Sequence, residues 1–543
     1  SASNAAAAAA AVNSCEGLDM LTSATLHRRA FDTDRGVAPH LARRVLANRT
    51  APQSVRTTLR APLQRFALRT LQRNLRELRD RHVEDGAVVV LDNASGEVLA
   101  WVGSSGALSQ ASQVDGVTAL RQPGSALKPF LYAQAIAQRR ITAASLLDDS
   151  ATHIATASGL YIPQNYDHHF KGWVSARTAL AASLNVPAVR TLEMVSPDAF
   201  HKQLVALGLP LRESGDFYGY SLALGSAEVS LLSLTNAYRT LANGGRASAS
   251  CWVLQANTNG TCGTPRSGGE RVHAAGAGTD ALTPTQVIDP RAAFIVADIL
   301  SDPIARAHTF GTDSLLATRF WSAVKTGTSK DMRDNWAIGF SRRYTVGVWV
   351  GNASGAPMWD VSGISGAAPV WAAVMQFLHR TEPSRAPVPP PGLVRAKVEF
   401  SAATGRGLPV EAARNEWFLQ GTEQARIVLD TDADPDANRA PNRMAGDGAS
   451  RAAAGVAARI VAPAHGTIIA LDPDIPPLRQ RVQFVAQGRD LHWMLDGKFL
   501  ARGAQVPWFP WPGRHSVQLA DARGKVLDEV RIEVRGAAAL THP

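Results

Sequence analysis

Two blocks of strand-forming sequence lie far apart in this chain, and together they restrict the folds that it can adopt. In residues 86–103 two apolar runs flank a short polar turn, which predicts a β-hairpin. In residues 324–350 two more apolar runs face each other across a second turn. The sequence between the blocks is typical of helices. We therefore predict an α+β sandwich, in which an antiparallel sheet built from distant segments is flanked by helices. Helices are expected at 127–138, 176–184, 228–242, 292–299 and 371–379.

Changes in composition divide the rest of the 543-residue chain, which is too long for one hydrophobic core. Residues 1–11 resemble a cloning remnant or residues of unassigned identity, and the arginine-rich residues 12–56 a linker or remnant before the core. The core domain is predicted at 57–384. An extended linker is predicted at 385–455 because it contains a proline run and a polar stretch without apolar periodicity. Short alternating segments then predict a small all-β sandwich at 456–543.

Charge and cysteine content exclude several classes of protein. The net charge is +10, but the arginines are scattered and show no alternation with aromatic residues, so we predict no nucleic-acid partner. The three cysteines have no metal-ligand spacing, so we expect no metal and no cofactor. Cys251 and Cys262 flank a turn-like segment. They would form a disulfide in an oxidising compartment, or else remain free thiols.

Ser125 and Lys128 form the first chemical candidate. A proline–glycine turn precedes the serine, and residues three apart on a helix share a face. A serine hydroxyl needs a neighbouring base to become a good nucleophile, and a lysine provides one when burial or nearby charge lowers its pKa. The chain is also poor in lysine, with eight in total. However, Ser322 and Lys325 repeat the spacing, and either pair alone is more often a solvated face.

Two further motifs follow Ser125. Ser183 and Asn185 lie where a predicted helix ends, and there a serine can relay a proton while an asparagine amide holds a peptide carbonyl. A lysine, a threonine, a glycine and a second threonine lie on a predicted strand. The glycine would leave room for a substrate to pair with the strand edge, while the lysine and the hydroxyls would bind a carboxylate. These residues are Lys325, Thr326, Gly327 and Thr328. Each motif alone is weak, but the three in this order are a strong signal.

The three motifs resemble those of the penicilloyl-serine transferases, most closely the class A penicillin-binding proteins. Residues 121–130, 165–167, 179–189, 325–329 and 333–337 carry this similarity, and residues 218–229, 460–463 and 470–476 resemble the 1C kind within that group. Lys330, Asp331 and Met332 stand where aromatic residues are expected, so the lip of the cleft is expected to differ. The glycosyltransferase domain and membrane anchor usual in the group are not found in this sequence.

The resemblance implies a serine D,D-transpeptidase. Lys128 would deprotonate Ser125, which would attack the carbonyl between the last two D-alanines of a peptidoglycan stem peptide. Backbone N–H groups of Ser125 and Thr328 would form the oxyanion hole. Ser183 and Lys325 would pass a proton to the leaving D-alanine, and an amine of a neighbouring stem peptide would accept the acyl group. β-Lactams would acylate the same serine.

Alternatives remain open. A D,D-carboxypeptidase or a β-lactamase would transfer the acyl group to water. Glu193 and Glu228 could activate that water by residue type, although their contexts favour packing or capping roles. A sensor or scaffold would acylate poorly and act through the β-module. The resemblance implies a location at the periplasmic face of the bacterial inner membrane, with an anchor outside this sequence, and it allows a protein or wall partner for the β-module.

Overall fold

The computed structural model describes residues 36–47, 54–152, 154–156, 159–161, 163–165, 169–254, 284–311, 313–402, 410–429, 458–463, 467–470, 482–488, 491–521 and 524–535. Its largest sheet has the strand order β2-β1-β11-β10-β9. β1 pairs antiparallel with β2 and with β11, so the two distant blocks share one sheet, as predicted. These strands are β1 (Asp85–Asp92), β2 (Val98–Val102), β9 (Ala323–Thr328), β10 (Asp334–Phe340) and β11 (Tyr344–Gly351).

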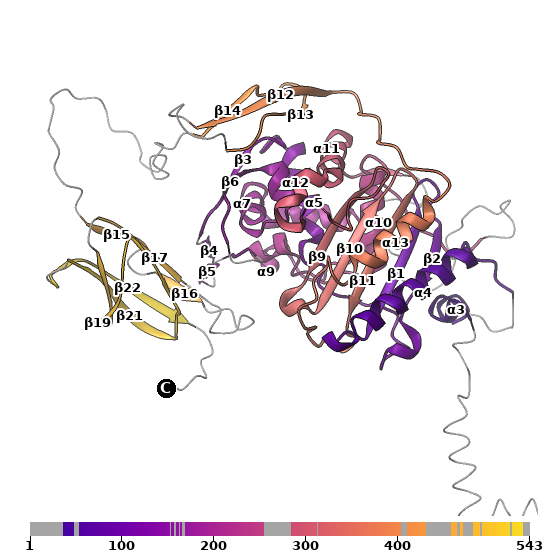
Figure 1. Cartoon of the computed structure of the whole chain (residues 1–543), viewed down its shortest axis with the longest axis horizontal. Helices are drawn as coiled ribbons and strands as arrows, with labels where there is room; N and C mark the ends of the chain where they lie inside the picture. Colours follow the sequence, from indigo (N-terminus) through magenta and orange to yellow (C-terminus); the bar gives the residue numbers. More distant parts are fainter. Residues whose placement is uncertain are drawn as a thin grey trace, which may run out of the picture.

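Helices cover both faces of this sheet (Figure 1). α4 (Ala61–Glu77) and α13 (Ala368–Leu378) pack on one face, in a core that includes Val88 and Val90. Helices α5 (Lys128–Ala137), α10 (Leu231–Ala242) and α11 (Pro290–Ser301) pack on the other face, in a core that includes Ala87, Val89 and Leu91. Neighbouring residues of β1 therefore serve opposite cores, as the alternation of side chains along a strand requires. The prediction of an α+β sandwich is confirmed.

Local sequence explains where the helices begin. The helix predicted from residue 228 begins at Leu231, because the Ser230 side chain accepts a hydrogen bond from the Ser233 N–H and caps the helix. α11 begins at Pro290, and the Asp289 side chain caps it. The remaining helices are α3 (Pro39–Leu46), η2 (Arg79–Arg81), η3 (Gly106–Leu108), η4 (Gly124–Leu127), α6 (Ala176–Ala181), α7 (Asn185–Val195), α8 (Pro197–Ala206), α9 (Gly215–Tyr218), η5 (Gly219–Leu224), α12 (Pro303–Phe310) and η6 (Lys330–Met332). Three two-stranded antiparallel sheets pair β3 (Leu146–Asp149) with β6 (Gly172–Ser175), β4 (Ile154–Thr156) with β5 (Gly159–Tyr161), and β7 (Arg246–Ala247) with β8 (Thr285–Gln286).

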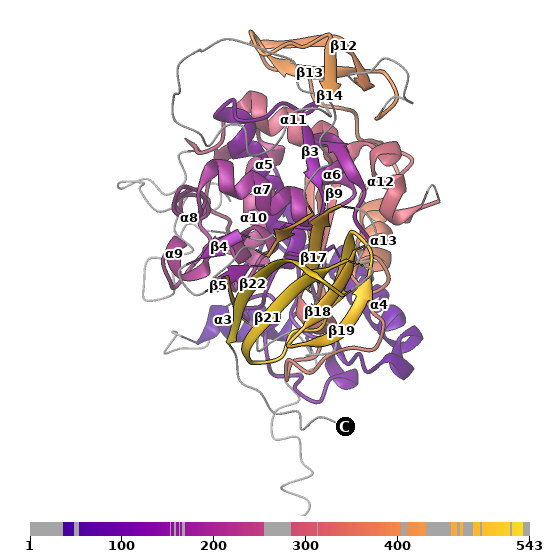
Figure 2. The same ribbon diagram turned by 90° about the vertical axis from the view of Figure 1, so that its left-hand side faces the viewer.

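The predicted extended linker at 385–455 is wrong for part of its length. A three-stranded sheet forms there, with the order β13-β12-β14, and lies beside α11 in two perpendicular views (Figures 1 and 2). Val398, Phe400 and Phe418 form a small buried core. The sequence did not predict this core, because proline-rich and charged residues flank these apolar positions. Its strands are β12 (Leu393–Ala402), β13 (Arg414–Leu419) and β14 (Arg426–Leu429). Similarly, α3 lies within the segment predicted as a linker or remnant at 12–56, and its Leu41 joins the main core.

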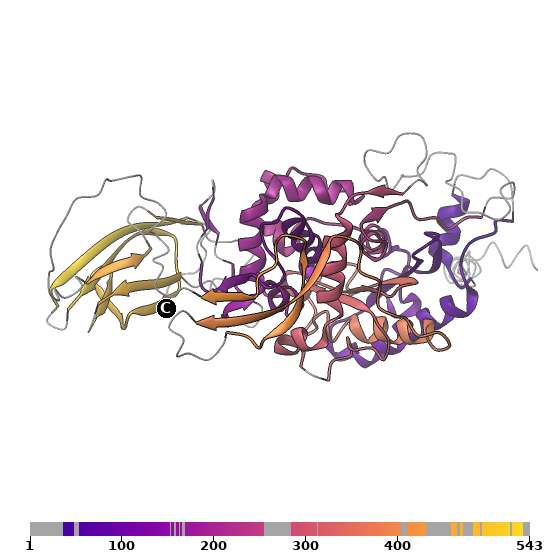
Figure 3. The same cartoon turned by 90° about the horizontal axis from the view of Figure 1, so that it is seen from above.

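The C-terminal residues form the predicted β-module, which Figure 3 shows as a separate unit. Two sheets, ordered β15-β17-β20 and β16-β22-β21-β18-β19, enclose a core that contains Phe484, Trp493 and Trp508. The short alternating segments predicted in this region are strands. The strands are β15 (Arg459–Ala462), β16 (Ile468–Ala470), β17 (Val482–Gln487), β18 (His492–Leu495), β19 (Lys498–Arg502), β20 (Gln505–Trp508), β21 (Gly513–Ala520) and β22 (Val526–Arg535).

Two predictions concern the chain as a whole. Cys251 is disulfide-bonded, but Cys262 lies outside the described residues, so the pairing of these two cysteines stays a prediction. Among the helices in the described part of the chain, none combines the length and the hydropathy needed to span a bilayer.

Candidate active site

Ser125 lies in the short helical turn η4, immediately before α5. Hydrogen bonds from three different parts of the fold fix this turn. The Trp336 indole donates to the Gln122 carbonyl at 2.8 Å, the Tyr238 hydroxyl donates to the Ala126 carbonyl at 2.7 Å, and Arg121 exchanges two backbone hydrogen bonds with Val229, at 3.0 and 2.9 Å. Ser125 itself stays partly exposed. The fold therefore presents one serine hydroxyl on a rigid, buried turn.

Lys128 is fully buried one helical turn after Ser125. Its Nζ donates to the Ser183 carbonyl at 2.8 Å, the Leu184 carbonyl at 3.0 Å and Asn185 Oδ1 at 2.6 Å. No described hydrogen bond joins Nζ to the Ser125 hydroxyl. Burial, and secondly the charge of Lys325, hold the Lys128 pKa well below its usual range. The three acceptors around Nζ match the three N–H groups of a protonated amine, whereas the neutral amine has two N–H groups and a lone pair that can accept a proton.

Ser183 joins the two lysines of the site. α6 ends at Ala181 and α7 begins at Asn185, and Ser183 adopts a left-handed conformation between them, with φ of 64°. Its hydroxyl accepts a hydrogen bond from Lys325 Nζ at 2.8 Å, while its carbonyl accepts one from Lys128. The structure therefore brings Lys128 of the first motif, Ser183 and Asn185 of the second motif and Lys325 of the third motif into one hydrogen-bonded group.

Lys325 lies on β9, as predicted, and is almost fully buried. Burial first, and the positive charge of Arg306 second, lower its pKa to about 7. Further along β9, the backbone of Thr328 lies directly against Gly124. A Cβ atom added to Gly124 would be 2.3 Å from the Thr328 carbonyl oxygen. The Thr328 hydroxyl accepts a hydrogen bond from the Gly363 N–H at 3.0 Å. The end of β9 is thus held beside the turn that carries Ser125.

This close approach predicts a large effect of one methyl group. Gly124 has a φ of +55°, which disfavours other residues, and a Gly124→Ala side chain would collide with backbone rather than with a flexible side chain. We expect β9 to move away from the turn and the rate of acylation by a penicillin to fall by about a hundredfold. A fluorescent penicillin measures this rate. Gly172→Ala is the matched control, because Gly172 has a φ of +70° but open space around its Cβ position. Equal rates in the two variants would contradict the prediction.

The Lys325 pKa predicts a dependence on pH. Below about pH 7 the Lys325 amine is protonated and can attract the carboxylate of a penicillin, and above it the charge is lost. We therefore expect the second-order rate constant for acylation to fall as the pH rises through about 7, whereas protonation of Lys128 would reduce it at lower pH. Stopped-flow measurements over this range provide the test. In Lys325→Arg the fall of the acylation rate constant should shift to higher pH, because a guanidinium remains charged. A wild-type rate that keeps rising above pH 7 would refute this role of Lys325.

Several residues that support the site were not predicted as functional residues from the sequence. The Asn165 side chain accepts a hydrogen bond from the Asn185 N–H at 2.8 Å, and its amide donates to both oxygens of the Asp149 carboxylate, at 2.8 and 2.7 Å. Asp149 is fully buried, and its negative charge raises the Lys128 pKa, against the effect of burial. Arg306 of α12 is also buried. Asn165 was noted only as part of the family resemblance, and the other members of that segment, Tyr166 and Asp167, lie outside the described residues.

Other sequence candidates form no described hydrogen bond with Ser125 or Lys128. The second Ser-x-x-Lys serine, Ser322, is buried and shares a hydrogen bond of 2.9 Å with the Thr318 hydroxyl. Glu193 and Glu228 are exposed and form no described hydrogen bond with Ser125 or Lys128. The unusual lip segment forms η6, in which Asp331 has a positive φ of 55°.

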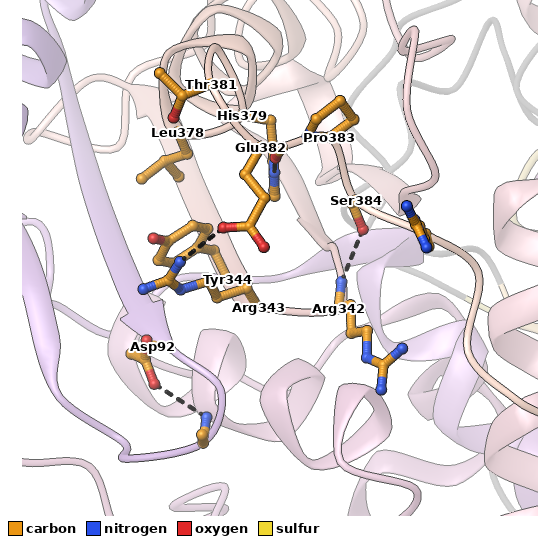
Figure 4. Close-up of a pocket in the computed structure, with 12 residues that line it drawn as sticks. Asp92, Arg342, Arg343, Tyr344, Leu378, His379, Thr381, Glu382, Pro383 and Ser384 are labelled. Atoms are coloured by element: carbon orange, nitrogen blue, oxygen red, sulfur yellow. Dashed lines mark hydrogen bonds and ion pairs between the residues drawn. The ribbon is translucent and has the colours of Figure 1, made fainter.

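A pocket of about 780 Å³ lies at the opposite end of the sheet (Figure 4). The β9–β10 register pairs Asn335 with Thr328 and Phe340 with Ala323, so the turn after Phe340 is remote from Thr328. In Figure 4 the Arg343 guanidinium at this turn faces the Glu382 carboxylate, at 3.2 Å. The pocket contains none of the motif residues.

The fold and the motif geometry define a penicillin-binding transpeptidase. A family model described as the penicillin binding protein transpeptidase domain matches residues 86–376, which is more than half of the chain. A second model, the Penicillin-Binding Protein C-terminus Family, matches residues 447–532. The chain therefore belongs to the penicillin-binding protein transpeptidase family.

Particular relatives support the predicted resemblance to the 1C kind. Penicillin-binding protein 1C of Escherichia coli (strain K12) is 32% identical over 395 residues, which are 71% of this chain and 47% of the relative. Penicillin-binding protein 2D of Bacillus subtilis (strain 168) is 29% identical over 70% of this chain and 52% of the relative. The chain thus spans about half the length of these relatives. The solved structure of PonA1 from Mycobacterium tuberculosis has a TM-score of 0.52 and 23% identity over 65% of this chain and 93% of its own. Penicillin-binding protein 1A from Haemophilus influenzae has a TM-score of 0.51 and 24% identity over 62% of this chain and 54% of its own. Both share the fold.

Proposed function

We propose that this protein is a serine D,D-transpeptidase, which cross-links peptidoglycan stem peptides through an acyl-enzyme on Ser125 and is acylated there by β-lactams. One observation carries the proposal. Lys128, at the start of α5, and Lys325, on β9, both donate hydrogen bonds to Ser183. A candidate base, a candidate proton relay and a positive charge therefore meet at Ser183, and the candidate base lies three residues after the partly exposed Ser125.

The chemistry of each of these side chains suits one step of the proposed reaction. The Lys128 amine takes the proton of the Ser125 hydroxyl, and the oxygen attacks the carbonyl between the two terminal D-alanines. The N–H groups of Ser125 and Thr328 stabilise the oxyanion. Ser183 relays a proton to the leaving D-alanine, whose carboxylate is held by Lys325 and by hydroxyls of β9. Asn185 orients the peptide, and an amine of a second stem peptide then takes the acyl group and releases Ser125.

The proposed substrates also imply a place and partners. D-Alanine-terminated stem peptides are wall precursors outside the bacterial inner membrane, so the protein would act at the periplasmic face of that membrane. The β-module would bind a protein or wall partner, since it adds a second folded unit without any of the motif residues.

Two separate incubations test the function, one with a fluorescent penicillin and one with D-alanine-terminated stem peptides and an amine acceptor. A stable label on the protein, together with cross-linked peptide formed without penicillin, is expected. Rapid release of the label with free acid as the only product would indicate a carboxypeptidase or a β-lactamase instead. Stable labelling without any peptide product would indicate a sensor or scaffold, and no labelling would refute the proposal.

A further inference from the structure

We propose that Glu416, on β13, is a positioning residue for Ser183, and that it acts through Arg177 of α6. This inference rests on the proposed acylation of Ser125. Glu416 lies beyond residues 86–376, the region matched by the transpeptidase family model. The small sheet that follows the matched region would therefore form a working part of the active site.

The Arg177 guanidinium is the centre of a buried ionic network. Its Nε donates to both oxygens of the fully buried Glu416 carboxylate, at 3.1 and 2.8 Å, and its Nη2 donates to Glu416 as well. It also contacts Asp298 of α11 at 2.5 Å, and Asp302, the cap of α12, at 3.2 Å. One side chain of α6 is thereby fixed to three other elements.

The start of α6 is tied to the same segment. The cap residue of α6, Ser175, donates its backbone N–H to Glu411 at 2.6 Å and accepts a hydrogen bond from Arg414 at 2.8 Å through its hydroxyl. Arg414 in turn contacts Glu411 at 2.6 Å and Glu416 at 3.0 Å. Packing adds to these bonds, because the Trp417 ring meets Phe294 of α11 edge-on, with centroids 5.4 Å apart. β13 thus holds both the cap and the first turn of α6.

The far end of α6 leads directly into the active site. α6 has six residues and ends at Ala181, so a tilt at its start moves Ser183 without a flexible connection to absorb it. The Ala182 carbonyl accepts a hydrogen bond of 2.9 Å from Thr309 of α12, whose cap Asp302 also binds Arg177. Arg177 therefore supports both flanks of the Ser183 segment. Displacements of about 1 Å at a catalytic group can cost about a hundredfold in rate.

Glu416→Gln is the sharpest test, because glutamine keeps the shape and can still accept from Arg177, while Asp298 and Asp302 still balance the guanidinium charge. Stopped-flow labelling with a fluorescent penicillin separates the affinity from the first-order acylation constant. We expect the acylation constant to fall at least about tenfold, with the affinity and the final labelled fraction changed by less than about twofold. Glu399→Gln is the matched control, since Glu399 pairs with Lys397 on the exposed face of β12, and it should react like the wild type.

The outcomes separate positioning from simple stability. A folded Glu416→Gln variant with the wild-type acylation constant overturns the inference, and so does one whose labelled fraction falls while its acylation constant is unchanged. If that variant does not fold, Glu411→Gln decides, because it weakens the contacts of Glu411 with Ser175 and Arg414 at the start of α6, and a wild-type constant there overturns the inference too. If the wild-type chain takes up no label, the proposed function fails and this inference with it. If the acylation constant falls in Glu416→Gln and Glu411→Gln but not in Glu399→Gln, the positioning role is supported.

Discussion

A Ser125→Ala chain is expected to take up no covalent penicillin label under conditions in which the wild-type chain is labelled completely. The label requires a bond between the Ser125 oxygen and the β-lactam carbonyl carbon, and alanine offers no atom for it. The turn should survive, because the hydrogen bonds that fix it involve the Gln122 and Ala126 carbonyls and not the Ser125 side chain. Denaturing gel electrophoresis after incubation with a fluorescent penicillin measures the result.

The chain provides its own control for this experiment. Ser322 has the same Ser-x-x-Lys spacing but is buried beside Thr318 at the far end of β9, so Ser322→Ala should label like the wild type. Thermal unfolding of both variants should show cooperative transitions. A label that persists in Ser125→Ala, or one that disappears in Ser322→Ala, would contradict the assignment of Ser125 as the nucleophile.

Replacing Lys128 with methionine is expected to slow acylation by about a thousandfold, the size of effect seen when a general base is removed. Methionine fills much of the same buried volume but cannot take a proton. Methionine makes none of the hydrogen bonds of the Lys128 amine, so the carbonyls of Ser183 and Leu184 and the Asn185 amide oxygen lose this donor. Each loss lowers the free energy of unfolding by about 1–3 kcal/mol. Removing a buried amine with a strongly lowered pKa offsets part of this cost. We therefore expect a folded but less stable protein.

Two companion variants make this result specific. Lys128→Arg should be as slow as Lys128→Met, because a guanidinium cannot accept a proton at neutral pH. Lys202→Met should react normally, because Lys202 pairs with Asp198 on the exposed surface of α8. The readout is the rate constant of labelling rather than its endpoint, so a loss of folded protein is not mistaken for a loss of the base. A Lys128→Met rate within about tenfold of the wild type would exclude Lys128 as the base.

The sequence was sufficient for the parts of the fold that depend on local patterns. Alternating apolar runs identified both hairpins of the main sheet, and the order of the three motifs identified Ser125, Lys128 and Lys325 as candidates. A helix end before Asn185 also placed the second motif at a junction, where the structure has Ser183 between α6 and α7. The hairpins and the helix end depend on neighbouring residues, and the order of the motifs is read along the chain, so none of them requires knowledge of distant contacts.

Only the tertiary structure decided which distant groups meet. The Ser183 hydroxyl lies against Lys325, and Asn165 connects Asn185 to the buried Asp149, because loops and strands from separate parts of the chain converge there. Glu416 was not predicted as a functional residue, because it lies in a segment predicted as a linker and because its partner Arg177 is far away in the sequence. The lowered pKa values of the two lysines likewise follow from burial first, and then from the charge of Lys325 on Lys128 and of Arg306 on Lys325. Burial and charge pairing depend on three-dimensional packing, whereas periodicity and motif order are properties of the chain alone.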